Sequence, residues 1–264
     1  MAGQSDSDLT RASAVRVRDW LLGGTLNTPV DRFVGRQIES VLPSIRQLLR
    51  AGRAFLRLAV GHMLDRGVRQ FVELGSGFPM AGQVHQLVRE RRLDAAVVYA
   101  DRDPAVVALG ESALWGVGRS AFVQADPLDP QAVLDHEQTR RLIDLAEPVG
   151  LLMIEVLQVM PDEAGPGRAI SAYRERLCPG SGVALSHVTS GLAPEYELIN
   201  AAHGVTLGHV TTRDSAVLSS WLTGLMLVPP GLAPLSEFLP SSEESARGSD
   251  DPLRHSLAAI GYEP

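Results

Sequence analysis

The stretch QFVELGSG, residues 70–77, decides the fold that this sequence predicts. Its first five residues form a short β-prone run, and Gly75 and Gly77 follow directly. Glycines at such a point let the chain turn tightly and let a ligand approach the backbone, where a side chain would block it. Glycine-rich turns between strands and helices also serve packing alone, so the meaning of this turn depends on the segments around it.

Four further strand-like segments follow this turn, with predicted helices between them. The strands are expected at residues 95–100, 121–124, 149–154 and 182–187, and the helices at residues 84–92, 104–115 and 169–177. Strands that alternate with helices predict a doubly wound α/β fold, with a mostly parallel sheet covered on both faces. A last strand is expected near residues 253–261, after an exposed loop rich in Ser, Glu and Gly from Pro240 to Asp251.

The region before the first strand contains only helical patterns. Residues 1–8 are expected to form a disordered tail, and three helices are expected between residues 9 and 66. Gly23-Gly24 ends the first of these patterns, and Pro43 separates the second from the third. We therefore expect an N-terminal helical cap at residues 9–67 and an α/β core at residues 68–264, which together form one compact domain.

The composition argues against several classes of protein. Of 264 residues, 45% are hydrophobic and 21% are charged, as in ordinary globular proteins. The net charge of −7 argues against a nucleic acid partner, because phosphate binding needs a basic surface. The single Cys178 excludes an intrachain disulfide, and His203 and His209 lack a convincing third metal ligand. The sequence shows neither a membrane span nor a secretory signal, so a cytoplasmic protein with no membrane partner and no metal site is expected.

Acidic residues near the ends of the first three strands indicate a nucleoside site. Glu73 precedes the glycine turn, Asp101 follows the second strand, and Asp126 follows the third. An acid at the position of Asp101 can accept hydrogen bonds from two ribose hydroxyls. Asp126 could accept a hydrogen bond from an adenine amino group, with Arg102 flanking the base. These positions predict a bound adenosine.

The glycine turn favours S-adenosylmethionine over a nicotinamide dinucleotide. A dinucleotide site has the pattern G-x-G-x-x-G with its pyrophosphate at a helix N-terminus, and here the third glycine is missing. The carboxylate of Glu73 would repel a pyrophosphate, whereas it suits the sulfonium and ammonium of S-adenosylmethionine. We therefore expect Glu73, Gly75, Ser76 and Gly77 to hold the methionine end of the cofactor, and an oxidoreductase is the poorest alternative.

The chain also resembles a broad actinobacterial family of S-adenosylmethionine-dependent methyltransferases, formerly catalogued as a domain of unknown function. The resemblance runs from about Ala14 to the C-terminus. Its carriers include DWLLGG (19–24), Asn27, DR (31–32), RAFL (53–56), RQFVELGSGFP (69–79), VH (84–85), VVYAD (97–101), DP (103–104), AD (125–126), PD (161–162), PGS (179–181) and SH (186–187). The family implies a class I methyltransferase (Rossmann-like) fold whose N-terminal helices cap the cofactor and the acceptor. It also implies that Asn27 and Arg53 belong to the cofactor site.

Several positions depart from the pattern of this family. The family usually has a tyrosine at Arg18, a Lys-Asp pair near residues 25–26, an asparagine at Gly52 and a histidine at Gln158. Glutamine cannot serve as a general base near neutral pH. Because several of these positions are expected to line the pocket, either the acceptor has changed or the methyl-transfer chemistry has been modified or lost.

Candidate catalytic residues are less clear than the cofactor site. His85, on the helix after the glycine turn, and His187, at the end of the fifth strand, could act as a base if the acceptor has to lose a proton. For each, the alternative is a hydrogen-bonded structural histidine. Glu155 ends the fourth strand and faces either the cofactor site or the exposed end of the sheet. Tyr196 could form an acceptor wall or belong to the core.

The sequence therefore predicts an S-adenosylmethionine-dependent methyltransferase that acts on a small-molecule acceptor, with S-adenosylhomocysteine as its product. A role in specialised metabolism and a homo-oligomeric state are also expected. Two alternatives stay open. One is a protein that binds S-adenosylmethionine but catalyses a non-methylating step, such as a cyclisation or an elimination. The other is a non-catalytic, nucleoside-binding regulatory protein.

Overall fold

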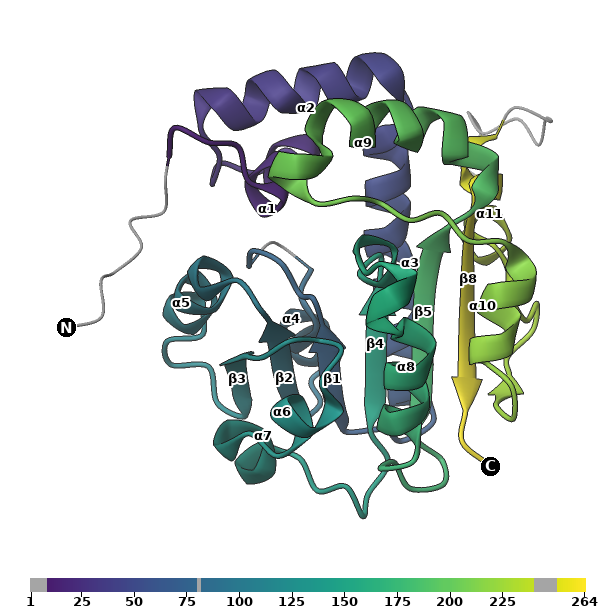
Figure 1. The fold of residues 1–264 in the computed structure, drawn as a ribbon. Coiled ribbons are helices and arrows are strands. Elements are labelled where there is room, and N and C mark those ends of the chain that lie inside the picture. Colours follow the sequence, from purple (N-terminus) through teal and green to yellow (C-terminus); the bar gives the residue numbers. More distant parts are fainter. Residues whose placement is uncertain (1–8, 80–81, 240–250) are drawn as a thin grey trace.

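The computed structural model describes residues 9–79, 82–239 and 251–264, and these are arranged around one central sheet (Figure 1). The strands are β1 (Gln70–Leu74), β2 (Ala96–Asp101), β3 (Ser120–Gln124), β4 (Gly150–Ile154), β5 (Gly182–Val188), β6 (Met226–Leu227), β7 (Ala233–Pro234) and β8 (Ser256–Tyr262). Their order is β3-β2-β1-β4-β5-β8-β6, and β7 also pairs with β8. The first five strands are parallel, and β8 is antiparallel to β5. The predicted mostly parallel α/β sheet is confirmed.

The strand order determines where the sheet can bind a ligand. The chain enters the sheet at β1, builds outward through β2 and β3, and then returns to the other side of β1 with β4. Phe71 of β1 pairs with Gly150 of β4 on one side and with Val97 of β2 on the other. Crossovers leave β1 and β4 in opposite directions, so a crevice opens at their carboxyl ends, where open α/β sheets bind ligands.

Helices cover both faces of the sheet. One face packs against α3 (Ile45–Asp65), α4 (Val84–Glu90) and α5 (Pro104–Ala113), and the other against α6 (Pro130–Leu134), α7 (Glu137–Leu142), α8 (Pro166–Arg174) and α10 (Ser215–Trp221). Because side chains alternate along a strand, Phe71 enters the first layer and Val72 the second. Met63 of α3 lies against Gly150 and Gly182, where a Cβ would come within 2.9 and 2.8 Å of its thioether.

The cap lies beyond the carboxyl ends of the parallel strands (Figure 1). It contains α1 (Ala14–Leu21), α2 (Pro29–Val41), the first turns of α3, and also α9 (Ala193–Leu207), which packs against α2. Sequence patterns assigned no element to α9, because its apolar residues do not fall on one face. The cap therefore has a C-terminal part that residues 9–67 do not include, and α3 continues from the cap onto the sheet.

Other differences from the predicted elements are local. Three short helices, α6, α7 and α10, and the segments β6, β7 and α11 (Leu235–Phe238) were not predicted. The predicted last strand begins at Ser256, after a 3-10 turn at Pro252–His255. The tail predicted for residues 1–8 lies outside the described residues, as does most of the loop predicted for Pro240 to Asp251. Within the described part of the chain, no helix is long and apolar enough to cross a membrane.

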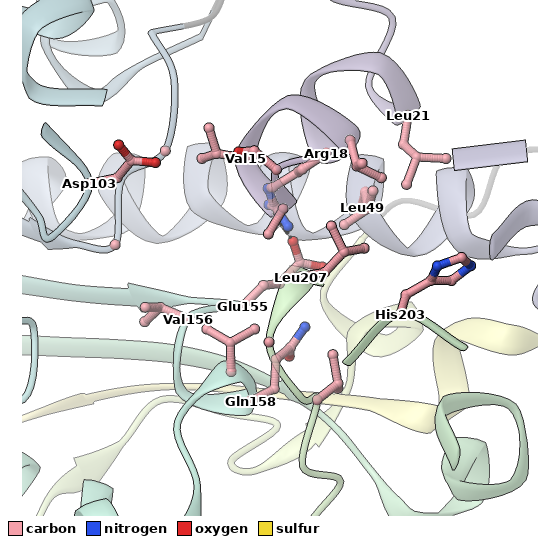
Figure 2. Close-up of a pocket in the computed structure, with 18 of the residues that line it drawn as sticks. Val15, Arg18, Leu21, Leu49, Asp103, Glu155, Val156, Gln158, His203 and Leu207 are labelled. Atoms are coloured by element: carbon pink, nitrogen blue, oxygen red, sulfur yellow. Dashed lines mark hydrogen bonds and ion pairs between the residues drawn. The ribbon is translucent and has the colours of Figure 1, made fainter. Parts of the chain in front are cut away.

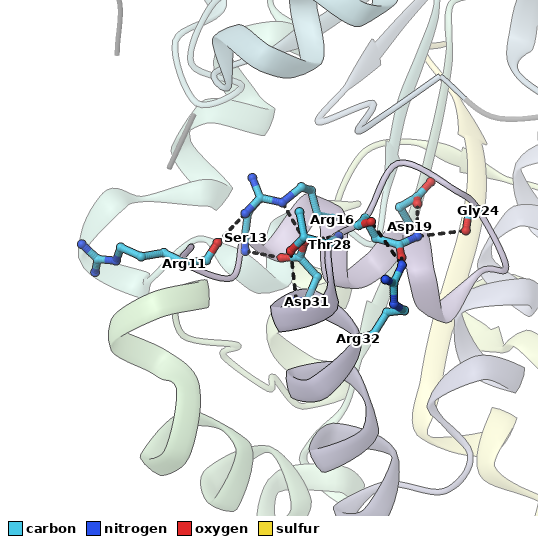
Figure 3. Close-up of polar contacts among 9 residues, drawn as sticks. Arg11, Ser13, Arg16, Asp19, Gly24, Thr28, Asp31 and Arg32 are labelled. Carbon is cyan, nitrogen blue, oxygen red and sulfur yellow. Dashed lines mark hydrogen bonds and ion pairs between the residues drawn. The ribbon is translucent and has the colours of Figure 1, made fainter. Parts of the chain in front are cut away.

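Asp31 ties the two N-terminal helices together (Figure 3). Its buried carboxylate accepts hydrogen bonds from the backbone N–H of Ser13 at 3.0 Å and from Arg16 Nε at 2.8 Å. It also accepts from the backbone N–H and the hydroxyl of Thr28, both at 2.7 Å. Thr28 Oγ1 in turn accepts from the N–H of Asp31, which completes the capping box that starts α2. Burial alone would raise the pKa of Asp31, but the hydrogen bonds from Arg16 and Thr28 outweigh burial and lower this pKa.

Candidate functional site

A cavity of about 470 Å³ lies between the carboxyl ends of the strands and the cap (Figure 2). Its floor comes from the turns after β1, β2 and β4, and its walls come from α1, α2, α3 and α9. It borders a smaller cavity of about 30 Å³ that lies around Glu73, Ser76 and Arg53. Val15, Arg18, Gly75, Gly77 and Ile154 line both cavities, so the two spaces meet beneath α1.

The two glycines of the turn have different requirements. Gly75 adopts a φ of 63°, and a Cβ at this position would overlap the side chain of Val156. Gly77 adopts a φ of 65°, which strains other residues, and a Cβ there would have only Val15, at 3.9 Å, within 4 Å. The backbone at Gly77 is therefore open to the cavity. This arrangement fits the prediction that a ligand approaches the main chain here.

Glu73 and Ser76 each place a buried oxygen atom at the smaller cavity. Among the described residues, neither Glu73 Oε2 nor the Ser76 hydroxyl has a hydrogen-bond partner. Arg53 Nη1 lies 3.8 Å from Glu73 Oε1, while Arg53 Nη2 donates to the backbone oxygen of Gly82 at 3.1 Å. Burial raises the pKa of Glu73 to about 7, although Arg53 and Arg18 act in the opposite direction. A buried carboxylate with a free oxygen beside a small cavity fits an ammonium group.

Asp101 is held in place by the turn that it faces. Its Oδ2 accepts from the backbone N–H of Gly77 at 3.0 Å, and its Oδ1 accepts from the N–H of Asp103 at 3.0 Å. Burial raises the pKa of Asp101. Asp101 lines the large cavity together with Arg102 and Asp103, so its position fits the predicted contact with ribose hydroxyls.

The structure does not bring Asp126 and Asn27 to the cavity lining. Asp126 is exposed, and its Oδ1 accepts from the N–H of Leu128 at 2.8 Å, while the next residue, Pro127, lines the cavity instead. The amide of Asn27 donates to Asp19 Oδ2 at 2.8 Å and accepts from Arg32 at 2.8 Å within the cap (Figure 3). These contacts support a structural role for Asn27, in place of the predicted cofactor contact.

Glu155 points into the cavity from the end of β4 (Figure 2). It adopts a φ of 57°, which is uncommon for a residue with a side chain, and its N–H lies 3.2 Å from both oxygens of Ser186. Its Oε2 accepts from Arg18 Nη2 at 2.6 Å, so an ion pair joins the cap to the sheet. Burial raises the pKa of Glu155, and Arg18 partly offsets this effect. At Gly52, a Cβ would lie 2.5 Å from the same carboxyl carbon.

Neither predicted catalytic histidine reaches the cavity. His187 is fully buried; its Nδ1 lies 2.6 Å from the oxygen of Val188, and its Nε2 lies 2.8 Å from Arg213 Nη1. Burial lowers the pKa of His187 to about 4, so the ring is neutral at pH 7. His85 Nδ1 lies 2.8 Å from the hydroxyl of Tyr99, and burial lowers its pKa. Their surroundings support structural roles for both histidines, in place of the predicted catalytic ones.

Sequence reasoning left several cavity residues without a role. Arg18 and Gln158 were noted only as departures from a family pattern, and both line the cavity. Tyr196, which lines it from α9, was considered a possible acceptor wall. Arg213 is 4% exposed and holds the segment after β4 by donating to the backbone oxygens of Leu157 at 2.9 Å and Met160 at 2.6 Å. No local pattern in the sequence identifies a buried arginine of this kind.

The fold and the site together define a class of protein. A parallel sheet that reverses its order between β1 and β4, with a glycine turn, Glu73 and Asp101 at that point, is the class I methyltransferase arrangement. The chain belongs to the S-adenosyl methyltransferase family, whose model matches residues 2–264. It is an S-adenosylmethionine-dependent methyltransferase by family, and the predicted cofactor and family are confirmed.

Solved structures agree with this assignment. The chain is similar to a DUF574 family protein from Streptomyces avermitilis, with 29% identity and a TM-score of 0.89 over 97% of this chain and 99% of that chain. A protein of Thermobifida fusca has 26% identity and a TM-score of 0.87 over 97% and 96% of the two chains. A plantazolicin methyltransferase in complex with S-adenosylhomocysteine shares the fold at 9% identity, with a TM-score of 0.55 over 95% of each chain. No curated protein matches the chain.

Proposed function

We propose that this protein transfers the methyl group of S-adenosylmethionine to a small-molecule acceptor bound in the cavity beneath the cap. The observation that carries the proposal is the pair of joined cavities. The smaller one contains the unpartnered Glu73 Oε2 and Ser76 hydroxyl, and the larger one extends from Asp101 to α9. The smaller cavity has room for the ammonium group of the cofactor, and the larger one has room for the rest of the cofactor and an acceptor.

Different residues would bind different parts of the cofactor. Glu73 and Ser76 bind the ammonium, the backbone at Gly75 and Gly77 lies along the methionine end, and Asp101 binds the ribose. Arg102 flanks the adenine, and Pro127 takes the place predicted for Asp126 in the cavity lining. S-adenosylmethionine, when bound, supplies an electrophilic methyl group.

The cap would exclude water and orient the acceptor. Arg18 joins α1 to Glu155 across the cavity, so closure of the cap and order at the end of β4 depend on each other. Positioning in a water-poor space supplies much of the rate of a group transfer. Because neither His85 nor His187 lines the cavity, we assign neither histidine as a general base.

An Asp101→Ala substitution tests the cofactor site by calorimetric titration with S-adenosylhomocysteine. We expect an affinity loss of roughly 100-fold, because the variant lacks the ribose contact and also the acceptor that fixes the N–H of Gly77. Asp94→Ala is the matched control, since Asp94 forms an exposed ion pair with Arg119 at 3.1 Å and should change the affinity less than twofold. An unchanged affinity in Asp101→Ala would refute the assigned site.

The binding of S-adenosylhomocysteine should depend on pH through Glu73. Burial raises the pKa of Glu73 to about 7, and only the ionised carboxylate suits an ammonium. The affinity should therefore be constant above about pH 7 and should fall by up to tenfold per pH unit below it. Titration at pH 6.5 in buffers of different ionisation enthalpy should reveal protons released on binding. An affinity that is flat between pH 5.5 and pH 8 would contradict the role of Glu73.

The two alternatives make different predictions for the same protein. A non-methylating enzyme would bind S-adenosylmethionine but form no S-adenosylhomocysteine during turnover. A regulatory protein would show weak cofactor affinity and no turnover with any acceptor. The unpartnered buried Glu73 favours an enzyme, because such a group costs stability and is retained where a ligand uses it. A place in specialised metabolism, a cytoplasmic location and a homo-oligomeric state stay predictions.

A further inference from the structure

Gln158 lies on the floor of the large cavity and presents one side of its amide to it. The residue is 6% exposed and lies in the 3-10 turn Leu157–Val159 directly after β4. Its backbone is fixed, because its carbonyl oxygen accepts from the N–H of Thr211 at 2.7 Å. In Figure 2 the amide nitrogen points upward, toward the side of the cavity where Glu155 and Leu207 lie.

The orientation of this amide follows from its neighbour. Val188 N–H lies 3.3 Å from Oε1 of Gln158, and a backbone N–H can only donate, so the atom that faces Val188 has to be the oxygen. The Nε2 group therefore turns the other way. Within the described residues no partner accepts a hydrogen bond from this Nε2, so Gln158 offers the cavity an N–H donor that is fixed and unused.

The lining that α2, α3 and α9 contribute to the cavity contains no Asp, Glu, Lys or Arg, and the paired Arg18 and Glu155 lie beside it. We define the acceptor chamber as the lining that α2, α3 and α9 contribute together with Gln158. Its walls are mainly apolar, with Ile38, Leu49, Ile199 and Leu207 among them, and α9 adds the polar side chains of Tyr196, His203 and Thr206. The charged residues Asp101, Arg102 and Asp103 lie at the adenosine end.

The two charges of the ion pair at the edge of the acceptor chamber already neutralise each other, so neither is available to a charged acceptor. Arg18 is bound to Glu155 at 2.6 Å, so an anionic acceptor would have to compete with a buried carboxylate for it. Burial raises the pKa of Glu155 and also that of Tyr196, which shows that the surroundings disfavour negative charge. An ion moved from water to such walls loses hydration that these walls do not replace.

An apolar acceptor without a suitable atom would also be penalised. It would cover the N–H of Gln158 and leave the donor unpaired, which weakens binding. We propose that the acceptor is an uncharged, mainly apolar molecule with a neutral oxygen, and that Gln158 positions it by donating Nε2–H to that oxygen. This inference rests on the proposed function, because the cofactor has to occupy the adenosine end of the same cavity.

The test uses two flat probes of nearly the same shape, 2-acetonaphthone and 2-isopropenylnaphthalene, which differ in C=O against C=CH₂. Their dissociation constants are measured by ligand-observed NMR on protein saturated with S-adenosylhomocysteine. In Gln158→Glu the carboxylate still accepts from Val188 but offers no donor to the probe. We expect the ratio of affinities, ketone over hydrocarbon, to fall roughly tenfold in this variant. Gln158→Met, which removes the donor without adding a charge, should lower the same ratio several-fold.

Gln131→Glu is the matched control, because it adds the same charge at an exposed position of α6 outside the cavity lining. It should leave the ratio of affinities unchanged. A purely structural role for Gln158 would weaken both probes equally and leave the ratio unchanged, which would overturn the inference. Binding of neither probe to wild-type protein would overturn it as well. The titration with S-adenosylhomocysteine alone is read first, so its failure identifies an error in the proposed cofactor site and not in the role of Gln158.

Discussion

Replacing Glu73 with glutamine is expected to weaken S-adenosylhomocysteine binding roughly 100-fold and, at pH 8, to make the protein more stable. The loss of binding follows from the removal of the only charge at the free Oε2, which we assign to the ammonium. The gain in stability follows from burial, since the folded protein has to keep a carboxylate away from water.

The size and the sign of the stability change follow from linkage. Burial raises the pKa of Glu73 from 4.5 to about 7, so protonated Glu73 stabilises the fold fully below about pH 4.5. This stabilisation is lost as the pH rises through 7. Glutamine remains neutral, and Glu73→Gln should therefore gain little at pH 4.5 and roughly 3 kcal/mol in the free energy of unfolding at pH 8.

Chemical denaturation at a series of pH values measures this difference. Glu90→Gln is the control, because Glu90 pairs with Arg57 at 2.7 Å on the surface and its side chain is 55% exposed. That variant should change the free energy of unfolding by less than about 1 kcal/mol at any pH. A Glu73→Gln protein that is less stable than the wild type at pH 8 would contradict the cost of the buried charge. One that still binds S-adenosylhomocysteine normally would contradict its role in binding.

The features that could be predicted from the sequence are those that local residues specify. The residues before Gly75 favour a strand and the two glycines favour a turn, independently of tertiary contacts. Accordingly, β1 was predicted with its observed bounds. Asp101 was placed correctly relative to the turn because it follows a buried strand that pairs with β1. The positions of the glycine turn and of Asp101 relative to each other are therefore predictable from sequence spacing, and their contacts with the cofactor stay predictions.

The remaining contacts of the site could not be predicted, because distant segments or local turns decide them. The pair of Arg18 and Glu155 joins residues 137 positions apart, and each has an ordinary sequence neighbourhood. His187 lies near the end of β5 as expected, yet Arg213 and Val188 occupy both of its ring nitrogens. Asp126 also follows its strand as predicted, but its carboxylate turns back to Leu128. In each case a tertiary contact decides what the side chain can bind.

Replacing Asp31 with alanine is expected to lower the free energy of unfolding by roughly 3–5 kcal/mol, the usual cost of removing one member of a buried ion pair. The carboxylate is fully buried and serves four donors from Ser13, Arg16 and Thr28. Without it, the Arg16 charge and two backbone N–H groups lose their acceptor, and α2 loses its capping box.

The same substitution should also weaken cofactor binding, although Asp31 does not line the cavity. Val15 and Arg18 line the cavity from α1, and Asp31 holds α1 against α2. Loss of this contact should lower the affinity for S-adenosylhomocysteine about tenfold. The amide hydrogens of residues 14–21 should also exchange faster. Asp214→Ala removes a single capping bond of 2.9 Å on α10, away from the cavity lining, and should cost only about 1 kcal/mol with no change in affinity. If Asp31→Ala destabilised the protein but bound S-adenosylhomocysteine as tightly as the wild type, the cap would not hold the cofactor. Because the two variants differ in whether they fasten α1, the comparison separates general destabilisation from loss of the cap.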